Sequence, residues 1–257
     1  MKTRLLAWTS VAVVNIFVGL ILASASSGHP AIEVVDSIWK HLGGKARWEK
    51  CRYLEFTWTS ELDNQVRATR KHTWDRYNGD YVLEFTGGDD TFKVFFNIDS
   101  KEGVGFKNGS KLTGEAHAQI MDRSYAIFCN DTYWLLAPTK LEDPGIRIQY
   151  IGHTGERDAD GSEGEFIVLH AWFEENVGVT PGDEYWFHVT HDGLVAGWRY
   201  RLEGGSEGEW EWVDEKECGM GITLSTRKVS GNRAIAFPSV KLSDTIDRSV
   251  FDPPSDT

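Results

Sequence analysis

The sequence predicts an α+β fold: a strongly curved antiparallel sheet, a half-barrel of about ten or eleven strands, with two helices on its concave side. Three observations predict this class. Most segments after residue 51 alternate apolar and polar residues with a period of two, as half-buried strands do. Turns rich in Gly, Asn and Asp separate these segments and favour antiparallel neighbours. Only two stretches have helical spacing, and a sheet of this size must curl or close because strands twist.

The chain begins with a segment typical of an export signal. Lys2 and Arg4 precede an apolar stretch at residues 5–22, and Ala23-Ser24-Ala25 offers the small residues that signal peptidase accepts. We interpret residues 1–25 as a signal peptide or an N-terminal inner-membrane anchor, because the stretch is slightly short for a bilayer. Either way the positive end stays inside. The sequence therefore predicts an exported protein of the bacterial periplasm or cell envelope.

The first element of the exported part is a short amphipathic helix. Pro30 stands at a plausible first position, apolar residues follow at helical spacing to Leu42, and Gly43-Gly44 ends the pattern. The period then changes to two, which predicts a series of hairpin strands. These strands cover residues 54–59, 66–76, 81–85 and 92–98.

The strand pattern pauses between Gly114 and Leu136. Ile120, Ile127 and Trp134 recur there at seven-residue intervals, which predicts a second helix that could break near Asn130. Strands then resume at residues 146–151, 166–173, 185–189, 194–202, 210–213, 222–229 and 235–242, and residues 243–257 form a loop or frayed end. Because no linker or repeat interrupts the series, we expect residues 31–254 to form a single domain.

Charge and cysteine content exclude several classes of protein. The formal net charge is −12 and no basic stripe offsets it, so nucleic acid is not an expected partner. Cys51, Cys129 and Cys218 are too few for a disulfide framework, and the sequence does not choose a pair among them. Neither the oligomeric state nor a loading or acceptor partner follows from the sequence.

The order of elements resembles the LolA/LolB superfamily of periplasmic lipoprotein carriers. The stretches Asn130–Pro138, Lys140–Gly145 and Thr180–Trp186 also resemble a family of exported bacterial proteins of unknown function near that superfamily. The resemblance covers about residues 31–254 and implies acyl chains held in an apolar cavity between the curved sheet and the helices. No position aligns with the gating arginine of LolA-type carriers, and the lipid-modified Cys of LolB is missing.

The leading hypothesis is a non-enzymatic protein that binds a hydrophobic small molecule or a lipidated protein in a cavity between sheet and helices. Burial of apolar surface would supply the affinity, and no cofactor or metal is expected. The candidate lining residues are Phe56, Trp58, Leu83, Phe85, Phe96 and Trp198 on strands, with Trp134 and Leu135 on the second helix.

Two alternatives stay open. One is a glycan-binding or glycan-cleaving protein that uses Trp platforms and a carboxylate pair such as Glu209 and Glu211. The other is an interaction or sensor module of the envelope with a filled core. His188 and His191 are three residues apart and would face opposite sides of a strand, so together with His170 they do not predict a zinc site. The acidic stretch 158–165 lacks the spacing of a calcium loop. No nucleophile, nucleotide-binding or metalloprotease motif is present.

Overall fold

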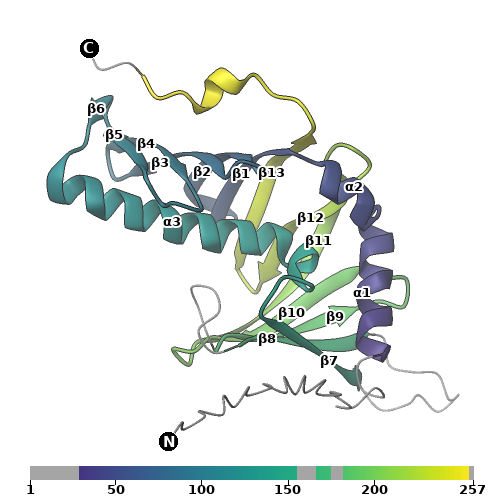
Figure 1. Cartoon of the computed structure of the whole chain (residues 1–257). Helices are drawn as coiled ribbons and strands as arrows, with labels where there is room; N and C mark the ends of the chain where they lie inside the picture. The colour runs from purple at the N-terminus through teal and green to yellow at the C-terminus, as the bar shows by residue number, and fades with distance from the viewer. Residues whose placement is uncertain (1–28, 155–165, 175–181, 255–257) are drawn as a thin grey trace, which may run out of the picture.

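The computed structural model describes residues 29–154, 166–174 and 182–254 of the chain. The described strands form one antiparallel sheet of 13 strands in the order β6-β5-β4-β3-β2-β1-β13-β12-β11-β10-β9-β8-β7. The sheet bends strongly, so that β1–β6 and β7–β10 lie on opposite sides of helix α3 (Gly114–Leu136) (Figure 1). The predicted α+β curved sheet is confirmed. The predicted export segment, residues 1–25, lies outside the described residues.

The first half of the sheet follows the predicted hairpins. Its strands are β1 (Tyr53–Leu62), β2 (Gln65–Asp75), β3 (Asp80–Gly87), β4 (Asp90–Asn97), β5 (Gly103–Lys107) and β6 (Ser110–Lys111). The last two account for the difference between the eleven strands expected at most and the 13 observed. A Cβ atom on Gly105 would lie 2.7 Å from the Ile120 side chain of α3, so close packing requires glycine at this position. Because glycine has no apolar side chain, the alternating pattern that predicts a strand is missing here.

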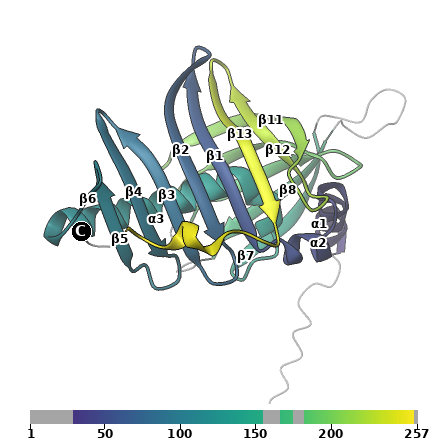
Figure 2. The same ribbon diagram turned by 90° about the horizontal axis from the view of Figure 1, so that it is seen from above.

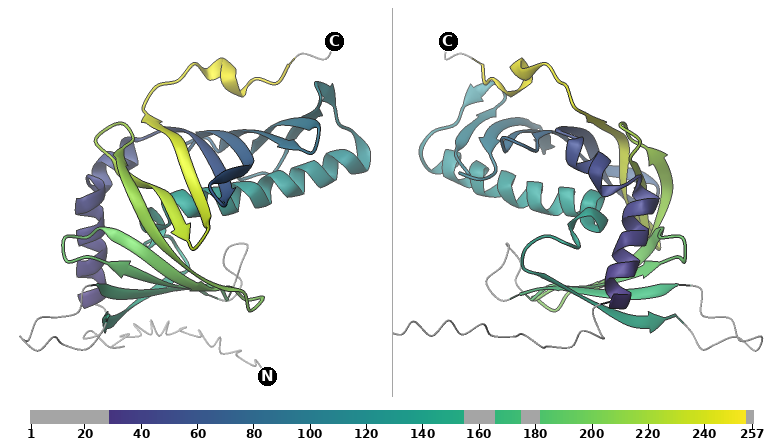
Figure 3. Two further views of the ribbon diagram at one scale, coloured as in Figure 1. Left: turned by 180° about the vertical axis from the view of Figure 1, so that it is seen from behind. Right: turned by 45° about the vertical axis from the view of Figure 1, so that its right-hand side comes forward.

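Helix α3 runs along the concave side of the sheet, as Figure 3 shows from two directions. Of the predicted seven-residue repeat, Ile120 and Ile127 are buried and Trp134 is half-buried, and Leu135 beside it is also buried. The helix is continuous through Asn130, which is exposed, so the expected break there is wrong. It ends in a short 3-10 helix, η1 (Ala137–Lys140), where Pro138 cannot extend an α-helix.

Helices α1 (His29–Leu42) and α2 (Lys45–Lys50) form a corner at one end of the curved sheet (Figure 1). The buried face of α1 includes Val35 and Ile38 and packs near β7, β8 and β12, within the same hydrophobic cluster as the concave face. Its Trp39 indole nitrogen donates to Glu142 at 2.6 Å. Helix α2 was not expected, because six residues are too few to display helical periodicity.

The second half of the sheet leads from β1 around to the far side of α3, where β7–β10 lie (Figure 1). Its strands are β7 (Ile146–His153), β8 (Ile167–Phe173), β9 (Glu184–Val189), β10 (Val195–Arg201), β11 (Glu207–Glu217), β12 (Thr223–Ser230) and β13 (Arg233–Ser243). Strand β13 pairs with β1, with Phe56 opposite Val240, and so joins the two halves into one sheet.

The C-terminal segment crosses the outer face of the first half, where its 3-10 helix η2 (Arg248–Phe251) is visible from above (Figure 2). Phe251 packs there on a small outer cluster of Val82, Phe95 and Phe106. Arg248 also donates to Asp80 at 2.8 Å. Over the described residues, no helix has both the length and the apolar character needed to span a membrane.

Candidate functional site

All eight predicted lining residues lie on the concave face or on α3. Pairing register places Phe56 opposite His72, which in turn faces Leu83, and it places Trp58 opposite Arg70, which faces Phe85. Seven of the eight are buried, and Trp134 is half-buried. The structure therefore gathers these residues into one hydrophobic cluster, but it divides them between the two halves of the sheet.

The second half of the sheet contributes a continuous aromatic surface that contacts α3. The ring of Trp134 lies 5.0 Å from that of Trp198 and 4.9 Å from that of Trp210, centroid to centroid. Trp198 lies 5.1 Å from Trp212, and Tyr133 of α3 stacks on Trp198 at 5.7 Å. Such edge and offset arrangements add to the apolar burial that fixes α3 on the sheet.

Five buried indole groups on this concave face have no hydrogen-bond acceptor among the described residues. We call them the concave indole groups, and they belong to Trp58, Trp74, Trp198, Trp210 and Trp212. A buried donor without a partner costs about 1–3 kcal/mol, and native proteins contain few of them. The Ser124 hydroxyl of α3 is likewise buried without a partner among the described residues. The concave site is thus lined by apolar rings and contains several buried hydrogen-bond donors without acceptors.

A buried polar network joins α3 to β2 beside these rings. The guanidinium Nη1 of Arg70 donates to both carboxylate oxygens of Asp131, at 2.7 and 3.0 Å. His72 Nε2 lies 3.1 Å from Asp131 Oδ2, while its Nδ1 lies 2.7 Å from the Tyr81 hydroxyl. Burial lowers the pKa of His72, against the opposing effect of Asp131. These four residues were not predicted, although Arg70 and His72 alternate onto the same face of β2 as the apolar Trp74, which was a visible signal.

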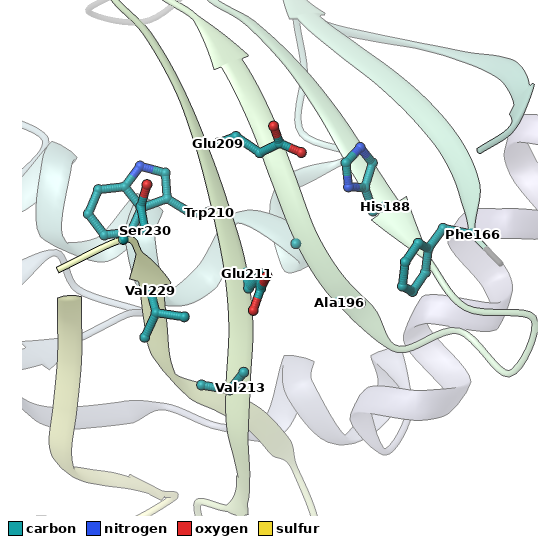
Figure 4. Close-up of a pocket in the computed structure, with 11 residues that line it drawn as sticks. Phe166, His188, Ala196, Glu209, Trp210, Glu211, Val213, Val229 and Ser230 are labelled. Atoms are coloured by element: carbon teal, nitrogen blue, oxygen red, sulfur yellow. The ribbon is translucent and has the colours of Figure 1, made fainter. Parts of the chain in front are cut away.

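The opposite face of the sheet carries a groove of about 880 Å³ (Figure 4). Glu209, Glu211, His188 and Phe166 line it, and register places Gly197 opposite both Glu211 and His188. Because Trp198 and Trp210 face α3, the residues next to them in their strands, which include Glu209 and Glu211, face outward. Glu209 and Glu211 are exposed, as their position between two buried tryptophans predicts.

The outer tryptophans already have stacking partners. His170 stacks between Trp172 and Trp186, at 4.8 and 4.7 Å between ring centroids, and Arg199 lies 4.5 Å over Trp186. His170 also contacts Glu184 at 2.9 Å. Both faces of Trp186 are therefore covered by protein groups, which leaves it no open face for a sugar ring.

The structure also bears on the possible metal sites and on the three cysteines. The described residues contain no group of three or more His, Cys, Asp or Glu arranged to hold a metal ion, and the acidic stretch 158–165 lies outside them. Cys51, Cys129 and Cys218 are all free thiols. Burial raises the pKa of each, so none has the character of a reactive thiolate.

Comparison with known proteins gives likenesses of shape at low sequence identity. No family model matches the chain, and no curated protein matches it. A Vibrio parahaemolyticus domain described as a candidate outer membrane lipoprotein-sorting protein is 10% identical, with a TM-score of 0.47 over 86% of this chain and 97% of that one. An uncharacterized conserved protein from Thermus thermophilus is 9% identical, with a TM-score of 0.31 over 88% of this chain and 96% of that one.

Proposed function

We propose that this chain is a non-catalytic, exported protein of the cell envelope that binds a hydrophobic ligand between α3 and the concave face of the sheet. The ligand would be an acyl chain, a lipid or a lipidated protein, and no cofactor would take part. The observation that carries the proposal is the set of concave indole groups, which are buried in an aromatic surface without acceptors from the described residues.

An acyl ligand matches the chemistry of this surface. Its long apolar body would cover aromatic rings at a gain of about 0.8 kcal/mol per buried methylene. Its ester or carboxyl oxygens are few, and they would accept hydrogen bonds from the indole donors that lack partners. A sugar, in contrast, carries a hydroxyl on nearly every carbon, and each hydroxyl also needs an acceptor for its own proton, whereas the unused concave indole groups are donors only.

Trp134 is the residue of α3 best placed to meet such a ligand. It is half-buried, and its ring contacts Trp198, Tyr200 and Trp210. A chain lying between α3 and the sheet would replace part of these ring contacts with its own. The site would then open by a local rearrangement between α3 and the sheet, a minor conformation that ligand binding makes the dominant one.

The first test asks what the protein carries and what it takes up. The full chain is purified without detergent, its organic extract is analysed by mass spectrometry, and a fluorescent fatty-acid probe is titrated into it. We expect an acyl-containing compound in the extract at near stoichiometric amount, or saturable binding of the probe. An extract without such a compound, together with no probe binding, would contradict the proposal.

A matched pair of tryptophan variants locates the site. Trp134→Ala removes a ring from the concave site, and we expect it to weaken probe binding about tenfold or more. Trp172→Ala removes a half-buried ring from the outer face and should leave probe affinity unchanged. If Trp172→Ala instead abolished binding of a soluble oligosaccharide while Trp134→Ala had no effect on either ligand, the glycan alternative at the outer groove would replace this proposal.

A further inference from the structure

Lys228 is a cation buried within the same concave surface. It lies on β12 opposite Trp212, and its side chain has no exposed area. Its Nζ lies 4.4 Å from the ring centroid of Trp212 and 4.9 Å from that of Phe237. It also donates to the carbonyl oxygen of Ser225. Burial of a lysine amine at this depth is rare and requires an explanation.

No carboxylate of the described residues lies within ion-pair distance of Lys228. Two half-buried arginines of the sheet, in contrast, are each paired with a carboxylate. Arg70 is paired with Asp131, and Arg227, the residue before Lys228, is paired with Glu61 at 2.7 Å. Two aromatic faces and one carbonyl stabilise the Lys228 ammonium by cation–π and hydrogen-bond interactions, but they leave its charge uncompensated.

The rings that hold Lys228 connect it to the proposed site on both sides. Trp212 contacts Trp198, which contacts Trp134 of α3. In the other direction Phe237 lies 5.9 Å from Phe56, one of the predicted lining residues. A ligand chain that lies along this aromatic surface would therefore bring its polar end next to the amine.

We propose that Lys228 binds the anionic head of the ligand, so that the ligand is an anionic amphiphile with a carboxylate or phosphate beside an apolar chain. This inference rests on the proposed function and narrows its ligand class. The head group would supply the missing counter-charge to the ammonium. The indole N–H of Trp212, unused and adjacent, could donate to a second oxygen of the same head.

The charge state of the free protein fits this role. Burial lowers the pKa of Lys228 to about 7, so that near neutral pH the amine is readily charged by an arriving anion. The Cys218 thiol is the titratable group that acts on it, and burial raises the pKa of that thiol to about 11. Cys218 is therefore neutral between pH 6 and pH 9 and does not replace the anion.

The test compares two probes of equal chain length by calorimetry: tetradecanoate, which is anionic, and tetradecanol, which is neutral. At pH 6.5 we expect the full chain to bind tetradecanoate about tenfold more tightly or better. Lys228→Met keeps the length and apolar character of the side chain and should bind both probes equally. Lys71→Met, which removes an exposed lysine from the outer face of β2, should behave as the unmodified protein does.

The outcomes separate this inference from the function on which it rests. If the unmodified protein binds both probes equally, or if Lys228→Met keeps the preference, the role of Lys228 is overturned while hydrophobic binding stands. If the unmodified protein binds neither probe, both proposals fail. A comparison of lysophosphatidylglycerol, which is anionic, with lysophosphatidylcholine, which has no net charge, then shows which anionic head group is bound. Once tetradecanoate is preferred, tighter binding of the former extends the class to phosphate lipids, and equal binding restricts it to fatty acids.

A pH series on the unmodified protein gives the same answer if the variant fails to fold. Tetradecanesulfonate keeps its charge throughout, so only the protein titrates. We expect its affinity to fall about tenfold between pH 6 and pH 9 as the Lys228 amine loses its proton, while tetradecanol affinity stays constant. A sulfonate affinity that does not change with pH would overturn the inference.

Discussion

At the scale of single residues, the molecule places charge where its sequence suggests only apolar packing. Asp131 is fully buried on a helix whose other inward residues are mostly apolar, and it is held by Arg70 and by the proximity of His72. Two polar side chains of β2 thus depend on one carboxylate of α3. A buried pair contributes little to stability as a whole, but removing one partner leaves the other uncompensated.

Asp131→Asn tests this dependence. The variant keeps the shape of the side chain but removes the charge that Arg70 and His72 face. We expect the free energy of unfolding to fall by about 3 kcal/mol in urea denaturation. Asp122→Asn, on the exposed side of the same helix, is the control and should change it by less than about 0.5 kcal/mol. Equal effects of the two substitutions would show that the network does not hold α3.

Residue by residue, alternation places Phe56 and Trp58 on one face of their strand and Trp198 on one face of its own, because successive side chains of a strand point to opposite sides. Period two does not show which of the two faces contacts α3. It could not find their polar neighbours. The contact of Arg70 with Asp131 joins residues 61 positions apart. Neither the sequence of the strand nor that of the helix shows how the two are aligned against each other. The buried position of Lys228 is hidden for the same reason.

At the scale of elements, long periodic segments were predictable and short or glycine-rich ones were not. Helix α3 begins and ends at the predicted residues, since 23 residues display their apolar stripe several times. Strand β5 contains two glycines in five residues and has no alternation to display. Gly103 is required there because a Cβ atom would lie 2.1 Å from the carbonyl oxygen of Phe95.

The corner between α1 and α2 offers a matched pair of glycines. Gly43 and Gly44 have similar backbone angles, with φ of +108° and +106°. A Cβ on Gly43 would lie 2.0 Å from the carbonyl oxygen of Gly221, whereas one on Gly44 would meet nothing within 4 Å. Both Ala substitutions introduce backbone strain, but Gly43→Ala also forces the corner away from the sheet. Thermal and urea unfolding should show it to be the more destabilising by about 2 kcal/mol; equal losses would mean that the corner moves freely.

At the scale of the whole molecule, the decisive feature is the place of β13 between β12 and β1. The last strand of the chain binds the two halves together, and turn chemistry along the sequence gave no sign of it because the pairing is non-local. The predicted curvature followed from strand count alone. The position of the groove lined by Glu209 and Glu211, on the outer face, did not follow from the pattern and separates the glycan alternative from the concave site.

This connection predicts cooperative unfolding. Because one sheet and one main hydrophobic cluster extend through both halves, residues 31–254 should lose structure in a single transition. Tryptophan fluorescence, which reports the concave rings, and far-ultraviolet circular dichroism, which reports the backbone, should give the same midpoint in urea. Two separated midpoints would show that the halves are independent domains.

The open edges of the sheet have a mechanical consequence. A closed barrel has a circumference fixed by its strand number and stagger. Among the described strands, β6 and β7 end the sheet and do not pair with each other, and the twist between neighbouring strands tolerates a range of angles. Small adjustments at successive strand pairs therefore add up to a wider or narrower trough with every ladder intact. The width of the trough is therefore adjustable, and the ligand proposed above could vary in girth without a change of strand pairing.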